Sequence, residues 1–262
     1  MPITLDQANL GEDASDVSSS TLVLTTIAAA ASGSTIVLGF MWAGDYDVSS
    51  ISGGGLTWTI HPHDAPGVGG PGNHMMAIAT AYAASGLASS TAVTITFGGA
   101  VAQKQVVGSS FLGVENPTVR EDDGLGFDSN PAADNPTWSV SLTTATAGAL
   151  LLGFSECTII ANSTPAGSAI ETHEYDFATS TNTVVLEYEV AGAAGAKTIG
   201  GQWDSAAFNG IAWNGIALKA TAITLDTVLP DADVTTTGWS TAPLFSKIND
   251  ASDATVIQAT AS

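Results

Sequence analysis

The sequence predicts an all-β protein, an antiparallel β-sandwich built from two similar halves and followed by an extended C-terminal arm. Three observations favour this fold: short apolar runs bounded by turn residues, a scarcity of charged residues, and an internal repeat. The 262 residues include 28 glycines, and only 11% are charged, against about 25% in an average domain. Serine, threonine and glycine supply the missing polarity, and they suit strands and tight turns better than exposed helices.

Apolar residues alternate or run in short blocks along the chain, and Gly, Pro, Asn and Asp residues bound these blocks. The pattern predicts about a dozen strands, at a spacing typical of a sandwich or barrel. The expected strands are residues 21–26, 35–42, 56–60, 75–83, 92–97, 105–114, 137–143, 149–156, 170–175, 183–190, 197–203 and 211–220.

Similar sequence elements occur in the same order in the two halves of the chain. LVLTT at 22–26 matches VSLTT at 140–144, and IVLGF in the strand after the first matches LLLGF in the strand after the second. TAYAASG likewise matches LEYEVAG, and each half ends on an apolar strand. The repeat therefore predicts a sandwich over residues 1–222 with halves at about 15–116 and 137–220.

The repeat permits two architectures. The halves form separate small sandwiches, or the strands of each half split between the two facing sheets of one sandwich. We favour the single sandwich, because about six strands make a thin core, whereas two large packed sheets bury both inner faces. The polar segment 115–138 between the halves is then expected to cross the surface as a loop.

The charge balance argues against two classes of partner. Five Lys and Arg residues stand against 25 Asp and Glu residues, so the formal net charge is −20. Nucleic acids and anionic membrane surfaces both attract cationic proteins. We therefore expect neither a nucleic acid nor a membrane as the partner.

The runs STLVLTTIAAAASGSTIVLGF, SSFLGVENP and FNGIAWNGIALKA together resemble a jelly-roll-like sandwich domain. That domain recurs in structural proteins of tailed bacteriophages and in some bacterial surface proteins, and the resemblance covers roughly residues 15–220. It implies a location in the virion and a non-enzymatic role, as a capsid decoration protein, head fibre or tail component.

Residues 223–262 are expected to form a C-terminal arm or an incomplete second module. LPDADVTTTGW and PLFSKINDASDATVIQ resemble the start of modules common in phage virion proteins, with Phe245 where those modules carry Tyr. About 40 residues with few large apolar groups do not fold alone, so we expect the arm to bind a neighbouring virion protein or a second copy, as in a homotrimer. The expected contact residues are Val228, Leu229, Val234, Trp239, Leu244, Phe245 and Ile248.

Two segments carry candidate metal ligands. HPHDAPGVGGPGNH contains three of the four histidines, but a hairpin loop explains its glycines and prolines without a metal. REDDGLGFD gathers oxygen ligands suited to calcium, but its spacing departs from the EF-hand pattern, and a solvated acidic loop is the favoured interpretation. We therefore expect no metal and no other cofactor. The candidate ligands are His61, His63 and His74 in the first segment, and Asp122, Asp123 and Asp128 in the second.

Carboxylates on predicted strands are the candidates for catalysis. Glu187 and Glu189 share one face of a regular strand, about 7 Å apart, and Glu171 and Glu174 lie on the strand before. Glycosidases use two carboxylates across a sugar ring, so a glycan hydrolase would lose its activity in Glu187→Gln. We favour instead an outward face that keeps the sandwich soluble, and a protein that is not an enzyme.

A carbohydrate-binding or adhesion module is the alternative function, and it would need exposed aromatic residues. Trp203 and Trp239 lie beside Asp or Gly turns and are the candidates for stacking on a glycan. Trp58, Trp138 and Trp213 lie within apolar strands and are expected in the core. The single cysteine, Cys157, is expected to be a small buried residue rather than a nucleophile.

Overall fold

The computed structural model describes residues 2–61, 74–115, 117–128, 136–177, 182–204 and 210–221, together with the strands 225–227 and 246–248. The chain separates into two compact units, Met1–Thr221 and Ala222–Ser262. In the second unit, β16 (Leu225–Thr227) and β17 (Ser246–Ile248) form an antiparallel pair. The described residues of the first unit form antiparallel sheets and no helix, so the all-β prediction is confirmed.

The first half of the larger unit forms two sheets that share one long strand. The inner sheet has the order β1-β7-β3-β6-β5, and the outer sheet has the order β2-β7-β4. The first part of β7 pairs with β2 and β4, and its last part pairs with β1 and β3. The strands are β1 (Thr4–Ser15), β2 (Ser19–Thr25), β3 (Ser34–Ala43), β4 (Val48–Gly53), β5 (Trp58–Ile60), β6 (His74–Ala83) and β7 (Ala92–Leu112).

The second half repeats this arrangement with separate strands. Its inner sheet has the order β12-β13-β10-β15-β8, and its outer sheet has the order β11-β14-β9. The strands are β8 (Arg120–Asp128), β9 (Thr137–Thr144), β10 (Leu150–Cys157), β11 (Ser163–Pro165), β12 (Ile170–Phe177), β13 (Asn182–Val190), β14 (Gly195–Trp203) and β15 (Ile211–Leu218).

The two halves have the same topology when the two parts of β7 are counted as the seventh and eighth strands of the first half. Each inner sheet then has the order 1-8-3-6-5 and each outer sheet the order 2-7-4. The neighbours 1-8-3-6 are those of a jelly roll, which differs only in placing its fifth strand beside the fourth. Each half is therefore a jelly roll of its own. The named strands of one half pair only with each other, and one isolated bridge, Val114 with Ala220, joins the halves.

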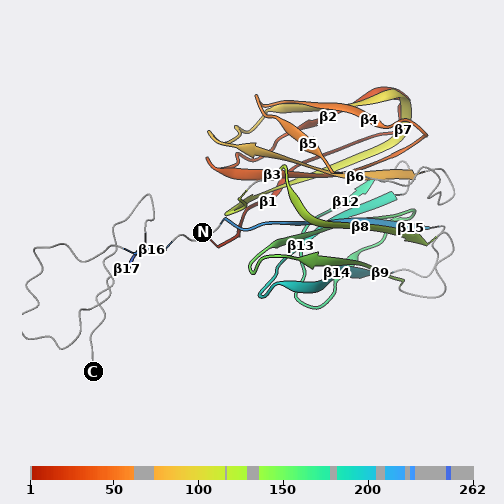
Figure 1. Ribbon diagram of the computed structural model, residues 1–262. Coiled ribbons are helices and arrows are strands. Elements are labelled where there is room, and N and C mark those ends of the chain that lie inside the picture. Colours follow the sequence, from red (N-terminus) through yellow and green to blue (C-terminus); the bar gives the residue numbers. More distant parts are fainter. Residues whose placement is uncertain are drawn as a thin grey trace, which may run out of the picture. The chain divides into compact units, whose positions relative to one another are not determined.

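The four sheets stack in layers, with the two inner sheets face to face (Figure 1). Each pair of adjacent layers encloses its own apolar cluster, two within the jelly rolls and one between them. The single two-sheet sandwich favoured from the repeat is therefore wrong. Because each inner sheet is covered on both faces, its central strands β3 and β10 are buried along almost their whole length, which explains their unbroken apolar runs.

We use the name seam for the contact between the two inner sheets. Phe154 of β10 lies in its centre with Leu152, Phe111 and Val37, all 0% exposed. A Cβ atom on Gly39 of β3 would lie 2.4 Å from Cδ2 of Phe154, so the absence of a side chain on Gly39 makes room for the ring. The seam is thus packed as closely as a protein core.

The matching IVLGF and LLLGF segments face opposite ways in the stack. Phe40 points into the core of the first jelly roll, whereas Phe154 points into the seam. Successive side chains of a strand point to opposite faces, so a shift of the strand by one residue moves every side chain to the other face of the sheet. The repeat preserves the order of the strands while the two halves differ in register.

Four strands of the larger unit, β1, β4, β8 and β11, lie where the sequence predicted none, and β7 joins two that were predicted separately. Strand β8 lies within the segment expected to be a loop, and β1 was not expected at all. Both are edge strands of inner sheets, and both are polar and acidic, which hides the apolar alternation. Strand β7 continues through the predicted gap at 98–104, where Gln103 has a positive φ of 46°.

Candidate functional site

The seam contains a buried ion pair between the two jelly rolls. Nδ1 of His74 on β6 lies 2.5 Å from Oε1 of Glu156 on β10, and Nε2 lies 3.1 Å from Oε1 of Gln103. His74 is 8% exposed and Glu156 is 2% exposed. Burial alone would lower the pKa of His74, but the charge of Glu156 and the hydrogen bonds to Glu156 and Gln103 together raise it.

A second histidine–glutamate pair crosses the seam in the opposite sense. His173 of β12, in the second jelly roll, contacts the carboxylate of Glu12 on β1 in the first. Its Nε2 atom also lies 3.3 Å from the amide nitrogen of Asn9. Each jelly roll therefore supplies one imidazole to a carboxylate of the other, and the two pairs fix how the inner sheets are aligned.

We expect Glu156→Gln to lower the free energy of unfolding by about 1–3 kcal/mol at pH 6, because the amide replaces a charged partner of His74 in a buried place. Urea unfolding measures the change. The matched control is Glu115→Gln, whose pair with Lys219 is 2.8 Å long and about 40% exposed on both sides. Exposed pairs contribute about 0–1 kcal/mol, so equal losses in the two variants would contradict the role of the seam pair.

His61, a candidate metal ligand, is also buried and has a different partner. Its Nε2 atom lies 2.7 Å from Oγ1 of Thr80, and that hydroxyl donates to the carbonyl of Pro117 at 2.5 Å. The hydroxyl proton is used on Pro117, so Nε2 of His61 carries the proton that Thr80 accepts. Burial, together with the nearby charge of Arg120, lowers the pKa of His61 to about 4, and the imidazole is neutral.

The structure does not bring the candidate metal ligands together. His61 and His74 each have separate partners, and His63 lies outside the described residues. Among the residues whose side chains are described, no three His, Cys, Asp or Glu side chains gather in a way that could hold a metal ion.

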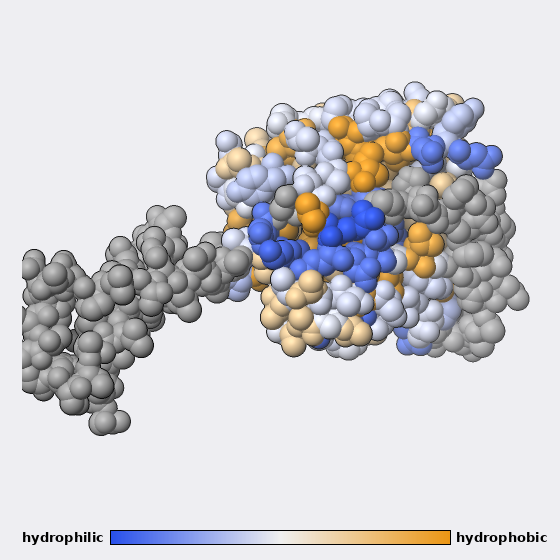
Figure 2. All heavy atoms as spheres, in the orientation of Figure 1, coloured by the Kyte–Doolittle hydropathy of each residue, from blue (hydrophilic) through white to orange (hydrophobic). Residues whose placement is uncertain are grey.

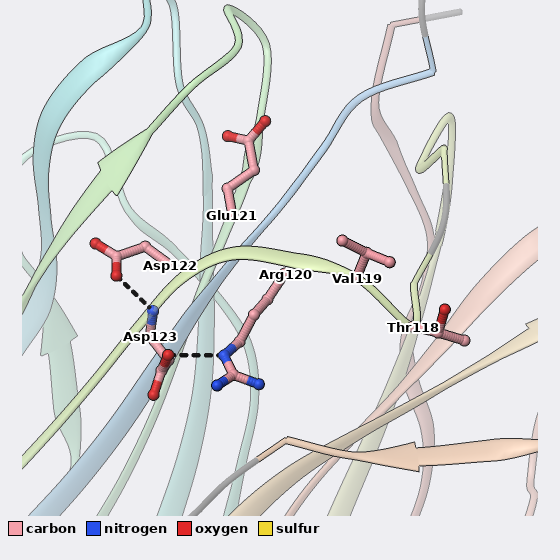
Figure 3. A pocket seen from close by; sticks show the side chains of 6 residues that line it. All are labelled: Thr118, Val119, Arg120, Glu121, Asp122 and Asp123. Atoms are coloured by element: carbon pink, nitrogen blue, oxygen red, sulfur yellow. Dashed lines mark hydrogen bonds and ion pairs between the residues drawn. The ribbon is translucent and has the colours of Figure 1, made fainter.

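The acidic segment at the start of β8 is held by backbone contacts rather than arranged around a cation site (Figure 3). Glu121 accepts hydrogen bonds from Ala145 and Thr146, and Asp122 accepts one from the backbone N–H of Thr143 at 2.5 Å. Asp123 pairs with Arg120 at 2.7 Å. The side chain of the third predicted ligand, Asp128, is outside the described part. The interpretation of this segment as a solvated loop is wrong, because it is a strand that pairs with β15.

Three of the four candidate catalytic carboxylates meet at one place in the second jelly roll. Oε2 of Glu174 accepts the backbone N–H of Ser163 at 2.5 Å, and Oε1 of Glu187 accepts its hydroxyl at 3.1 Å. Glu171 lies opposite Glu187 in the ladder between β12 and β13. We call Glu171, Glu174 and Glu187 the carboxyl cluster.

Two members of the carboxyl cluster, Glu174 and Glu187, have pKa values raised to near neutrality. Burial raises the pKa of Glu187 to about 7, and the charges of Glu171 and Glu174 add to the effect. Burial likewise raises the pKa of Glu174 to about 7, again with help from neighbouring carboxylates. Glu187 is 0% exposed, and its Oε2 atom has no hydrogen-bond partner. The interpretation of Glu187 as part of an outward, solvated face is therefore wrong.

The burial of Glu187 influences the stability of the fold and keeps its carboxyl group away from a substrate. A general acid must come within hydrogen-bond distance of its substrate, and Glu187 is enclosed between the sheets with one oxygen on Ser163. A Cβ atom on Gly201 would lie 2.7 Å from Oε1 of Glu187, so the carboxyl group is covered by the backbone of β14. Glu189, two residues later, is half-buried and stands apart from the cluster.

The tryptophans are arranged differently from the prediction for glycan binding. Trp203 is 0% exposed and lies in the core between β14 and the inner sheet, so its assignment as a stacking residue is wrong. Trp239 lies outside the described residues. Trp138 is buried as expected, whereas Trp58 and Trp213 are half-buried, and the indole of Trp213 covers the bare backbone of Gly126 on β8.

Two exposed aromatic residues are not among the candidates that the sequence suggests. Tyr46 is 51% exposed and Tyr82 is 50% exposed. The ring of Tyr46 covers Gly99, where a Cβ atom would lie 2.5 Å from it, whereas Tyr82 lines an open depression. Neither tyrosine lies in a pattern that distinguishes it from a core residue.

Cys157 is buried, and its Sγ atom donates to the carbonyl of Ile159 at 3.0 Å. Burial strongly raises the pKa of the thiol, which confirms the prediction of a buried, unreactive cysteine.

The comparisons with known proteins found nothing similar. No family model matches the chain, and no curated protein and no solved structure is significantly similar to it. Within the ranges that the structure describes, no helix is long and apolar enough to span a membrane. The fold and the site thus define the molecule by its architecture, as a tandem jelly-roll protein with one buried and one partly exposed histidine–glutamate pair across its seam.

Proposed function

We propose that this protein is a non-enzymatic structural component of a particle, of the tailed-phage virion type, and that its tandem jelly roll is the rigid unit from which the particle is built or decorated. The observation that carries the proposal is the seam. A continuous apolar core, bordered by two reciprocal histidine–glutamate pairs, joins the jelly rolls into one block. Interfaces that are large and hydrophobic oppose relative domain motion.

The edge strands support a role at high local concentration. The strands β1 and β8 each close one side of an inner sheet and carry several carboxylates, among them Glu12, Asp13, Glu121 and Asp122. Figure 2 shows hydrophilic side chains gathered where Figure 1 draws β8. Charged edge strands resist pairing with the edges of other molecules. Crowded copies would then associate only through dedicated contacts.

The C-terminal segment is the candidate for such a contact. It forms a compact unit of its own, Ala222–Ser262, of which only the pairing of β16 with β17 is described. The predicted contact residues Val228, Leu229, Val234, Trp239, Leu244 and Phe245 lie outside the described residues, and only the backbone of Ile248 is described. We therefore retain the arm as part of the proposal.

The proposal predicts that the full chain forms a defined oligomer and that a chain ending at Thr221 is a monomer. The apolar residues of the segment would otherwise stay exposed to water. Light scattering after size-exclusion chromatography measures both masses. A monomeric full chain, or an oligomer that survives the truncation, would contradict the role of the segment.

A second experiment tests the location. Mass spectrometry of gradient-banded phage particles from cells that carry the gene is expected to find the chain at a fixed copy ratio to the other particle proteins. Its absence from every banded particle, with the protein present in the soluble fraction, would refute the virion proposal.

A further inference from the structure

A depression of about 480 Å³ lies where three parts of the chain meet beside the seam. Residues 55–57, between β4 and β5, form one wall, and Tyr82 near the end of β6 forms another. Glu115 and Pro117, in the connection between the jelly rolls, form the third. Small-molecule sites in proteins have volumes of about 300–1,000 Å³, so this space is large enough for one. We call it the seam depression.

Tyr82 gives the seam depression an apolar surface. It is 50% exposed, although every other residue of β6 is buried or half-buried. Tyrosine combines a flat apolar ring with a polar hydroxyl, and such side chains are enriched where a partner binds. An exposed ring at the end of a buried strand, beside a hollow, is therefore suited to stacking against a ligand.

The negative charge of Glu115, which lines the seam depression, is neutralised by an ion pair. Glu115 pairs with Lys219 at 2.8 Å, and both remain about 40% exposed. The carboxylate can accept further hydrogen bonds, and the hydroxyl of Thr57, which also lines the depression, can both donate and accept them. Together these groups match a ligand that carries several hydroxyls.

Gly55, in the wall formed by residues 55–57, has no side chain. Its φ is +69°, and a Cβ atom there would meet no other atom within 4 Å. A side chain at this position would therefore project into open space beside the hollow rather than into the protein.

We propose that the seam depression binds a neutral saccharide. A pyranose ring has an apolar face for Tyr82 and hydroxyls for Glu115 and Thr57. The net charge of −20 disfavours phosphates and acidic sugars, and the ion pair on Glu115 removes the attraction for a cation. The inference goes beyond the structural role proposed above and stands independently of it.

An adjoining depression of about 420 Å³ extends the site along the chain (Figure 3). The two share Thr118, and the second is lined by the residues that follow, including Val119 and the Arg120–Asp123 pair. Val119 is 60% exposed and offers a second apolar surface. The pair of depressions has room for two linked sugar units.

The test applies the labelled full chain to an array of immobilised neutral and acidic oligosaccharides, and then titrates the strongest neutral ligand in solution. We expect Tyr82→Ala to weaken binding about tenfold or more, because the ring is the main contact. Gly55→Asn is expected to weaken it similarly, because Asn tolerates a positive φ and its side chain would stand in the open space beside the hollow, where it obstructs a bound ligand.

Matched controls separate binding from folding. Tyr82→Phe keeps the ring and is expected to retain binding. Gly167→Asn makes the same substitution at another glycine with φ +64° and open space around it, and it should have no effect. If Tyr82→Ala fails to fold, Gly55→Asn decides. An array with no neutral ligand, or binding that Gly55→Asn leaves unchanged, would overturn the proposal.

Discussion

Replacing Phe154 by alanine is expected to lower the free energy of unfolding by about 3–5 kcal/mol, the usual cost of removing a buried phenylalanine. Phe154 is 0% exposed and fills the centre of the seam, against the backbone of Gly39. Each inner sheet also packs against an outer sheet on its other face. The two inner sheets therefore cannot easily move together to fill the cavity that the ring leaves. Denaturant unfolding followed by circular dichroism measures the loss.

The same experiment distinguishes a seam from a loose contact. If the two jelly rolls form one cooperative unit, Phe154→Ala shifts a single transition that includes both halves. Val17→Ala, at a position that is 72% exposed, is the control and should change stability by less than about 0.5 kcal/mol. A loss below about 1 kcal/mol in Phe154→Ala would mean that the inner sheets do not pack as described.

Glu187→Gln is expected to stabilise the protein by about 2 kcal/mol at pH 7.5 and to have almost no effect at pH 4.5. The pKa of Glu187 is raised from its ordinary value of 4.5 to about 7, mainly by burial. Because the pKa of Glu187 is higher in the folded than in the unfolded chain, its protonated form stabilises the fold fully at pH values below the unfolded pKa. This stabilisation is lost as the pH rises through the folded pKa of about 7. Glutamine retains an acceptor for Ser163 and cannot ionise, so it avoids the loss.

Comparing the variant with the wild type at each pH isolates Glu187 from the other titrating groups. His61 acts in the opposite sense, because its pKa is lowered to about 4 and its contribution is lost as the pH falls from 6.5 towards 4. Glu189→Gln, on the same strand but half-buried, is the control, and an equal stabilisation in it would contradict the role of burial at Glu187. A stabilisation that is equal at pH 4.5 and pH 7.5 would show that ionisation is not its cause.

The sequence predicts best those strands whose side chains are buried on both faces, because their composition reflects that burial directly. IVLGF in β3 and LLLGF in β10 are apolar at consecutive positions, because both faces of these strands are buried. The jelly-roll-like order and the repeat were also visible. The stacking of four layers was not, because a fully apolar strand fits the middle of one sandwich as well as the middle of a stack.

The acidic edge strands lie outside the repeat that the sequence shows, which covers about 15–116 and 137–220. Strand β8 precedes β9 as β1 precedes β2, and both pairs occupy the same places in their jelly rolls. Composition concealed them, since edge strands need charge to resist pairing. Likewise, the neighbouring Asp204 suggests that Trp203 is exposed, although Gly201 and Ile199, two and four residues earlier, place it on the buried face.

The seam pairs were out of reach of the sequence. His74 and Glu156 are 82 residues apart, and no local pattern links them. Their meeting depends on how two sheets align face to face, which side-chain packing decides. Glu187 was recognised as a candidate, but its burial depends on β11 and β14 lying over it, and that too is a tertiary feature.

Hydrogen exchange of the backbone amides in the intact chain tests the central claim, that the two jelly rolls are one rigid block, most directly. The account predicts that the amides of β3 and β10, on the two sides of the seam, are the slowest to exchange and open with the same free energy. Phe154→Ala should lower both values together. Opening of β10 at a markedly lower free energy than β3, with β3 unaffected by the substitution, would show two independent domains and contradict the account.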